Sequence, residues 1–209
     1  MNTKVADAIM KGKLVKFGLF TYTSGKQGPI YIDLRELPSY PKLFNDVTNE
    51  LSRLVQSLPC DIVAGAETAG IPLSTAVSIK TGTPMIYVRK EPKKHATKSQ
   101  IEGILEKGKR VILVDDLITY GTSKINFING IKKAGGRIKD IVIVLERGEK
   151  NGGRELLKKK GYKLHALLTL KELMEYMVKK HKLSKKLQQS TIQYLDNPDR
   201  WEKSLKKSH

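Results

Sequence analysis

Two adjacent carboxylates at the end of an apolar segment are the residues best suited to chemistry in this sequence. Residues 111–114 read Val-Ile-Leu-Val, and Asp115 and Asp116 follow them directly. A stretch with hydroxyl side chains and one glycine comes next and ends at Thr122 and Ser123. Ligands of open α/β sheets bind beyond the carboxyl ends of the strands, where the start of a helix offers backbone N–H groups to an anion. The pattern therefore predicts a phosphate site close to a carboxylate pair.

The ligand that this arrangement favours is a ribose 5-phosphate unit. Thr119, Thr122 and Ser123 would donate their hydroxyls to the phosphate, and Gly121 would let it approach the backbone closely. Two carboxylates would repel a phosphate that touched them, but one sugar away they would accept hydrogen bonds from a ribose diol. An acidic strand end before a capped helix is the simpler alternative for an Asp-Asp pair. The whole string, from apolar strand to helix, favours the ligand site.

The elements that would position this site alternate between strands and helices. Short apolar runs predict buried parallel strands at residues 61–66, 84–88, 110–114 and 140–145, of which 140–145 is the last core strand. Helical patterns occupy residues 41–57, 70–80, 121–134 and 154–160. The alternation predicts an α/β fold with an open, mostly parallel sheet that is flanked by helices.

The two ends of the chain differ from this centre. Residues 1–40 predict an amphipathic helix and then a small hood, with short strands around residues 20–23 and 30–34. Residues 41–170 form the predicted core, and residues 171–209 form a helical, lysine-rich C-terminal extension without an assigned role. The single cysteine, Cys60, excludes a disulfide framework and a multi-cysteine metal site.

The composition is strongly basic, with 39 Lys and Arg against 21 Asp and Glu and a formal net charge of +18. Such a charge fits a solvated surface of dispersed lysines, a small phosphorylated ligand or, as the partner that we least expect, nucleic acid. The longest apolar runs are too short to cross a bilayer, and the N-terminus has no apolar stretch of signal-peptide length. We therefore expect a cytoplasmic protein without a membrane partner.

The string from Val111 to Ser123 resembles the phosphoribosyl-pyrophosphate (PRPP) signature of type I phosphoribosyltransferases. Three other segments narrow this resemblance to the orotate phosphoribosyltransferases. Residues 88–96, Val-Arg-Lys-Glu-Pro-Lys-Lys-His-Ala, are similar to that family's flexible catalytic loop. Residues 16–33 resemble its N-terminal hood, and residues 144–147 resemble the strand end that carries an arginine for the orotate carboxylate.

The resemblance implies a reaction, a cofactor and an assembly. Orotate and PRPP would give orotidine 5′-monophosphate and pyrophosphate, in de novo pyrimidine (UMP) biosynthesis. Mg²⁺ would be held mainly by PRPP and water, with no direct protein ligand. The flexible catalytic loop would act as a lid over pyrophosphate, and a homodimer would share lid residues across its interface.

The same resemblance implies the site residues. The PRPP-binding residues would be Arg89, Lys90, Lys93, His95, Asp115, Asp116, Leu117, Ile118, Thr119, Tyr120, Gly121, Thr122 and Ser123. Lys93, His95, Asp115 and Asp116 would be catalytic. Lys26, Tyr31, Thr119 and Arg147 would bind orotate.

The chain departs from the family pattern at several positions, and two alternatives stay open. Lys94 and Ala96 flank the lid histidine where an acidic residue and a glycine are common, and Thr23 replaces a hood lysine. A phosphoribosyltransferase for another base would share the Asp115–Asp116 loop, but Arg147 suits a carboxylated base. A nucleic-acid-binding regulator that senses PRPP would explain the charge but would not need the lid.

Overall fold

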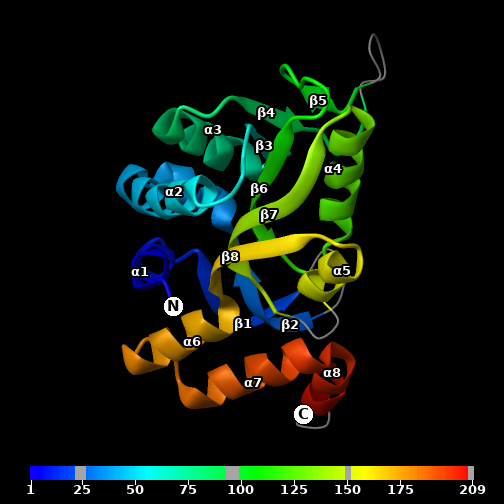
Figure 1. Cartoon of the computed structure of the whole chain (residues 1–209). Coiled ribbons are helices and arrows are strands. Elements are labelled where there is room, and N and C mark those ends of the chain that lie inside the picture. Colours follow the sequence, from blue (N-terminus) through cyan, green and yellow to red (C-terminus); the bar gives the residue numbers. More distant parts are fainter. Residues whose placement is uncertain (22–26, 93–98, 149–151, 207–209) are drawn as a thin grey trace.

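The computed structural model describes residues 1–21, 27–92, 99–148 and 152–206, with side chains up to residue 203. Its centre is a six-stranded sheet with the strand order β5–β4–β3–β6–β7–β8 (Figure 1). The strands are β3 (Ile62–Ala66), β4 (Met85–Val88), β5 (Ile101–Glu102), β6 (Arg110–Ile118), β7 (Arg137–Glu146) and β8 (Lys163–Thr169). Neighbouring strands are parallel except for β4 and β5. The predicted mostly parallel sheet is confirmed.

Helices cover both faces of this sheet. In Figure 1, α1 (Thr3–Lys11), α2 (Pro41–Gln56) and α3 (Gly70–Thr81) lie on one side, and α4 (Thr122–Lys133) and α5 (Gly153–Lys159) lie on the other. Pro41 stands in the first turn of α2, where its missing N–H costs no hydrogen bond. α3 ends at Gly82, whose φ of 68° ends the helix in the left-handed conformation. The helices between the strands therefore match the predicted alternation.

The central strands are buried on both faces because successive side chains point to opposite sides of the sheet. On β6, Ile112 and Val114 belong to the hydrophobic cluster that includes Leu51 of α2. Val111 and Leu113 belong instead to the cluster that includes Phe127 of α4. This explains why residues 110–114 read as a continuous apolar run rather than as an alternating pattern.

The N-terminal hairpin and the C-terminal helices pack together. β1 (Val15–Thr21) and β2 (Gln27–Ile32) form a separate antiparallel pair, and a 3₁₀ helix follows at Leu34–Ser39. The C-terminal helices are α6 (Leu170–Lys179), α7 (Lys185–Asp196) and α8 (Pro198–Lys206), and α7 and α8 both contact β2 (Figure 1). Ile30, Tyr194 and Trp201 share one hydrophobic cluster. The predicted hood and the C-terminal extension are thus in contact, while the predicted domain boundaries stay a prediction.

Two expectations from the sequence were wrong about strands. Residues 140–145 are not the last core strand, because β8 follows and pairs with β7 at the sheet edge. β8 contains Lys163, His165 and Thr169 and is only partly buried, so it lacks the continuous apolar pattern of the inner strands. The hairpin strands also begin earlier than expected, at Val15 and Gln27. No described helix is long and apolar enough to cross a membrane.

Gly70 tests how closely α3 approaches the central strand. A Cβ atom at Gly70 would lie 2.4 Å from the carbonyl oxygen of Val114 and 3.3 Å from the Cα of Asp115. Because these are backbone atoms of β6, we expect Gly70→Ala to lower the free energy of unfolding by about 1–3 kcal/mol, measured by urea denaturation.

Gly130 of α4 provides the matched control. A Cβ there would meet only the Gln100 side chain, at 3.0 Å from its Oε1, and that flexible side chain can move aside. Gly130→Ala should therefore be less destabilising than Gly70→Ala, helped by the higher helix propensity of alanine. Equal losses in the two variants would show that the approach of α3 to β6 does not limit stability.

Candidate active site

A cavity of about 640 Å³ lies beyond the carboxyl end of β6. Its lining includes a continuous run of residues from Asp115 to Lys124, together with Lys90. Other lining residues come from the end of β2 and from residues 67–69, which follow β3. The predicted ribose-phosphate segment therefore forms one wall of a single cavity, at the sheet edge where the sequence pattern placed it.

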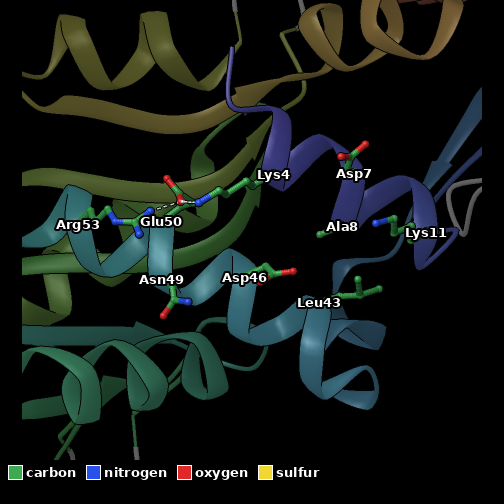
Figure 2. A pocket seen from close by; sticks show the side chains of 9 residues that line it. All are labelled: Lys4, Asp7, Ala8, Lys11, Leu43, Asp46, Asn49, Glu50 and Arg53. Carbon is green, nitrogen blue, oxygen red and sulfur yellow. Dashed lines mark hydrogen bonds and ion pairs between the residues drawn. The ribbon is translucent and has the colours of Figure 1, made fainter. Parts of the chain in front are cut away.

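A second hollow, of about 210 Å³, lies between α1 and α2 (Figure 2). Its lining mixes the cations Lys4, Lys11 and Arg53 with the acids Asp7, Asp46 and Glu50. Glu50 pairs with Arg53, and Asp7 accepts a hydrogen bond of 2.9 Å from the Tyr176 hydroxyl. These charges largely serve contacts between helices, so this hollow is a weaker candidate than the cavity at the end of β6.

The two adjacent carboxylates have different surroundings. Asp115 is 5% exposed, and its Oδ2 accepts a hydrogen bond of 2.5 Å from the Nζ of Lys124, which is 6% exposed. Its Oδ1 accepts the backbone N–H of Asp116 at 2.9 Å. Among the described residues, no cation is hydrogen-bonded to Asp116, whose Oδ1 accepts the backbone N–H of Leu117 at 2.7 Å. Asp115 is thus held in place from α4, and Asp116 is held only from its own strand end.

This difference affects the protonation of Asp116. Burial, together with the negative charge of neighbouring Asp115, raises the pKa of Asp116 to about 7. The Lys124 ammonium opposes that rise, but it lies against Asp115. The pair can therefore gain or lose a proton near neutral pH, which is typical of carboxylates in functional sites.

The loop between β6 and α4 is suited to an anion. Gly121 takes up a left-handed conformation, with φ of 82°, directly before the first turn of α4. No side chain caps that turn, so its backbone N–H groups face the cavity end of the helix without a side-chain acceptor. Thr122 and Ser123 add hydroxyl groups to the cavity lining. A phosphate at this position would meet the positive end of the α4 dipole.

The start of α5 fixes the outer side of this loop. The backbone N–H of Gly153 donates to the carbonyl of Thr119 at 2.7 Å. A Cβ at Gly121 would lie 2.9 Å from the Cα of Gly153, and a Cβ at Gly153 would lie 2.3 Å from Ile118. Two glycines thus allow the loop and the next helix to touch through their backbones.

Sequence reasoning missed two cations of this cavity. Arg35, just after β2, lines the cavity and binds both oxygens of Asp33, at 2.7 and 2.6 Å. Its guanidinium lowers the pKa of the Asp33 carboxyl. Lys124 directly follows Ser123, so it lies just beyond the segment that resembles the PRPP signature. A search for a cation in the first turn of the helix that follows the carboxylate pair would have found Lys124, whereas nothing local marks Arg35.

The segment after β3 supplies the remaining wall. Glu67, Thr68 and Ala69 line the cavity, and the Glu67–Thr68 peptide bond is cis. The Oε2 of Glu67 accepts the backbone N–H of Lys90 at 2.7 Å, which links this segment to the end of β4. Ala69 thus stands directly before Gly70, where the resemblance often has a lysine, and Glu67 organises the backbone after β4.

Other predicted site residues lie beside the cavity or outside the described part of the chain. Arg89 follows β4 and pairs with Glu102 at 3.5 Å, and it does not line the cavity. Tyr31 is 36% exposed, and its hydroxyl donates to Asp33 at 3.3 Å. Arg147 follows β7, and its backbone N–H donates to the carbonyl of Ile118 at 3.1 Å. The residues outside the described ranges are Lys26, Lys93, Lys94, His95 and Ala96.

The described residues offer no ready-made metal cluster. Within residues 1–21, 27–92, 99–148 and 152–206, no group of three or more His, Cys, Asp or Glu side chains is placed to hold an ion. Asp115 and Asp116 are the acidic side chains of the β6 wall.

Comparison with known proteins agrees with this geometry. The phosphoribosyl transferase domain family matches residues 36–172. An orotate phosphoribosyltransferase from Saccharolobus solfataricus is 38% identical over 91% of this chain and 95% of its own length. One from Pyrococcus furiosus is 36% identical over 84% of this chain and 96% of its own length.

Solved structures of the same kind superpose on the chain. The structure of Leishmania donovani UMP synthase has 32% identity and a TM-score of 0.82, covering 93% of this chain and 42% of that chain. The orotate phosphoribosyltransferase from Aeropyrum pernix has 29% identity and a TM-score of 0.71, covering 83% of this chain and 99% of that chain. Both structures therefore share the fold of this chain, the first over a larger part of its length.

Asp116 provides a test of the cavity's electrostatics. Because its pKa is raised in the folded protein, the folded state holds the proton more tightly than the unfolded chain, whose value is near 3.8. The contribution of Asp116 to stability should therefore fall as pH rises from 3.8 to about 7 and then stay at the lower level. Asp116→Asn removes this loss, so its stability advantage should be larger at pH 8 than at pH 5 by at least about 1 kcal/mol.

The measurement is the urea-unfolding free energy of both proteins at the two pH values. Turnover of the variant should fall even where its stability rises, since the carboxylate faces the cavity. An advantage that is the same at pH 5 and pH 8 would contradict the raised pKa.

Proposed function

The chain belongs to the orotate phosphoribosyltransferases, within the phosphoribosyl transferase domain family, and from that membership we propose the reaction and the roles of its site residues. The reaction transfers the ribose 5-phosphate group of PRPP to orotate and gives orotidine 5′-monophosphate and pyrophosphate. It belongs to de novo pyrimidine (UMP) biosynthesis. The observation that carries the proposal is the single cavity lined by every residue from Asp115 to Ser123.

The phosphate and the ribose fit two neighbouring parts of this wall. The 5′-phosphate binds at the first turn of α4, where Gly121, Thr122 and Ser123 present N–H and hydroxyl groups. The ribose hydroxyls then lie against Asp115 and Asp116, one sugar length back along the loop. This order keeps the two carboxylates away from the phosphate.

The chemistry needs positioning and charge more than covalent help. When the bond from the ribose C1 to pyrophosphate loosens, its electron pair leaves with the pyrophosphate oxygen and positive charge develops on the sugar ring. Carboxylate charge at Asp115 and Asp116 stabilises that positive charge at short range in a water-poor cavity. A nitrogen of orotate then bonds to C1 from the opposite face, provided that the base is held in line. That nitrogen gives up its proton, which an oxygen of the departing pyrophosphate can accept.

The departing pyrophosphate requires cations. Lys90 and Arg35 also line the cavity, which makes Arg35 an addition to the residues expected from the sequence. The lid residues Lys93 and His95, with Arg89, would complete this cationic surface. Ala69 and Thr68 bring backbone groups to the same side.

The cofactor of the proposal is Mg²⁺. Two adjacent carboxylates and no larger group of described acids fit an ion that takes most of its oxygen ligands from PRPP and water. When bound with PRPP, the ion supplies positive charge that offsets the charge of the pyrophosphate oxygens. Arg35 and Lys90 then act on the outer oxygens of the same group.

Recognition of orotate is proposed for residues around the hairpin. Tyr31 on β2 would stack on the base, and Arg147 at the end of β7 would meet its carboxylate, with Lys26 and Thr119 as further contacts. The Arg147 backbone is bonded to Ile118, which lines the cavity, so the residue lies at the cavity margin. A homodimer with shared lid residues is part of the same proposal, and the cytoplasmic location stays a prediction.

The carboxylate pair provides the direct test of the function. We expect wild-type protein with Mg²⁺ and PRPP to consume orotate, followed by loss of orotate absorbance, and to leave adenine, guanine, hypoxanthine and uracil unchanged. Asp115→Asn combined with Asp116→Asn should lower turnover at least about 100-fold, because the positive ribose ring loses its countercharge.

Circular dichroism and thermal unfolding serve as the control for folding of this double variant. Near-normal turnover of a folded double variant would show that Asp115 and Asp116 do not have the proposed role in catalysis. Turnover with a purine base but not with orotate would replace orotate by that base.

The shared lid can be tested by mixing two inactive proteins. One carries Lys93→Ala and the other carries both Asp→Asn changes at residues 115 and 116. If the lid closes over the neighbouring subunit, each mixed dimer has one intact site, and about a quarter of wild-type activity should return after random exchange at equal amounts. No recovery after verified subunit exchange would mean that each lid serves its own chain.

A further inference from the structure

The C-terminal extension reaches the residue proposed to bind the orotate carboxylate. α7 and α8 contact β2, which carries Tyr31, and α7 also approaches the end of β7 through Tyr194 (Figure 1). The Nη2 of Arg147 donates to the Tyr194 hydroxyl at 3.4 Å. The guanidinium carbon of Arg147 lies 5.7 Å from the centre of the Tyr194 ring. A side chain 47 positions further along the chain thus contacts the Arg147 guanidinium.

Tyr194 is itself held firmly. It is 7% exposed and meets Trp201 edge to face, with ring centres 5.3 Å apart and an interplanar angle of 78°. The indole N–H of Trp201 donates to the Ser190 hydroxyl at 2.9 Å, one turn before Tyr194 on α7. Both aromatic residues belong to the hydrophobic cluster that also includes Ile30 of β2. The ring against Arg147 is therefore fixed by packing on two sides.

A fixed aromatic surface matters for an arginine because its side chain has many rotamers. Binding a carboxylate with two parallel hydrogen bonds requires one orientation of the planar guanidinium. An aromatic ring attracts the cation and leaves the N–H groups at the guanidinium edges available to other acceptors. Arg147 is then already ordered before the substrate binds, so binding costs less side-chain conformational entropy.

We propose that Tyr194 is a positioning residue that orients Arg147 for the carboxylate of the base, and that this is a function of the C-terminal extension. The inference rests on the proposed function, in which Arg147 binds orotate. It adds that residues 185–206 take part in base recognition through Arg147, although α7 and α8 lie outside the sheet. Trp201 supports the same contact from behind.

Steady-state kinetics of the full-length chain test this proposal, with orotate and PRPP varied separately. Tyr194→Leu should raise the KM for orotate about 3- to 10-fold, because the cation loses its aromatic partner. The kcat and the KM for PRPP should change less than about twofold, because the ribose-phosphate wall is untouched. Tyr194→Phe keeps the ring and should restore the orotate KM to nearly the wild-type value, since the hydroxyl contact of 3.4 Å is long.

Tyr176 of α6 is a matched control. It is also buried, its hydroxyl donates to Asp7 at 2.9 Å, and the Nζ of Lys180 lies 5.4 Å from its ring centre. Tyr176→Leu should lower the melting temperature about as much as Tyr194→Leu while the orotate KM stays at the wild-type value. If Tyr194→Leu does not fold, Tyr194→Met takes its place, since an unbranched apolar side chain fills the same space without a ring.

Arg147→Ala separates this inference from the proposed function. It should raise the orotate KM about 10- to 100-fold, and adding Tyr194→Leu to it should cause no further increase. If Arg147→Ala raises the KM and Tyr194→Leu does not, the inference is wrong and the proposed function stands. If Tyr194→Leu has the same effect with and without Arg147, the extension acts through another contact and the inference is also wrong. If Arg147→Ala leaves the orotate KM unchanged, the proposed role of Arg147 fails, and with it the role of Tyr194.

Discussion

The buried ion pair between Asp115 and Lys124 is the contact on which the cavity wall depends. It joins the last buried part of β6 to the first turn of α4, so both ends of the loop between them are fixed. Removing one partner of a buried pair leaves an uncompensated charge, which typically costs about 3–5 kcal/mol. The pair also leaves Asp116 as the carboxylate without a bonded cation, and burial beside Asp115 raises its pKa to about 7. This one contact thus holds both ends of the loop between β6 and α4 and gives the two carboxylates different electrostatic surroundings.

The parallel sheet explains why segments far apart in the sequence line one cavity. β3, β4 and β6 run in the same direction, so their carboxyl ends meet at one edge. The Glu67 carboxylate and the Lys90 backbone are joined there, opposite the β6 wall. The hairpin adds Arg35 from outside the sheet. The cavity therefore combines acidic and basic side chains from separate elements, although the chain as a whole is strongly basic.

The C-terminal helices pack against the rest of the protein outside the sheet. Their buried residues share one hydrophobic cluster with α1, α2 and the hairpin, so they are part of the body of the protein. Most of their length also has a counterpart in the Leishmania donovani structure, which covers 93% of this chain. Through the contact of Tyr194 with Arg147, these helices are connected to the proposed orotate site. The packing of an extension and the recognition of a substrate are then linked by one arginine.

The sequence by itself determined the alternation of strands and helices and the ribose-phosphate segment, because both depend on neighbours along the chain. Residues 111–123 contain their strand, their loop and their helix start, as predicted, but β6 continues past both carboxylates to Ile118 instead of ending at residue 114. Only the tertiary structure placed Arg35 at the cavity and Tyr194 against Arg147, since both placements depend on the packing of distant elements. β8 was missed for a related reason: an edge strand is partly exposed, so its residues lack the apolar run that marks the inner strands. The local hydrophobic pattern of a segment indicates which of its residues are buried. Which residues from other segments line the same cavity depends on how the whole sheet and its covering helices pack.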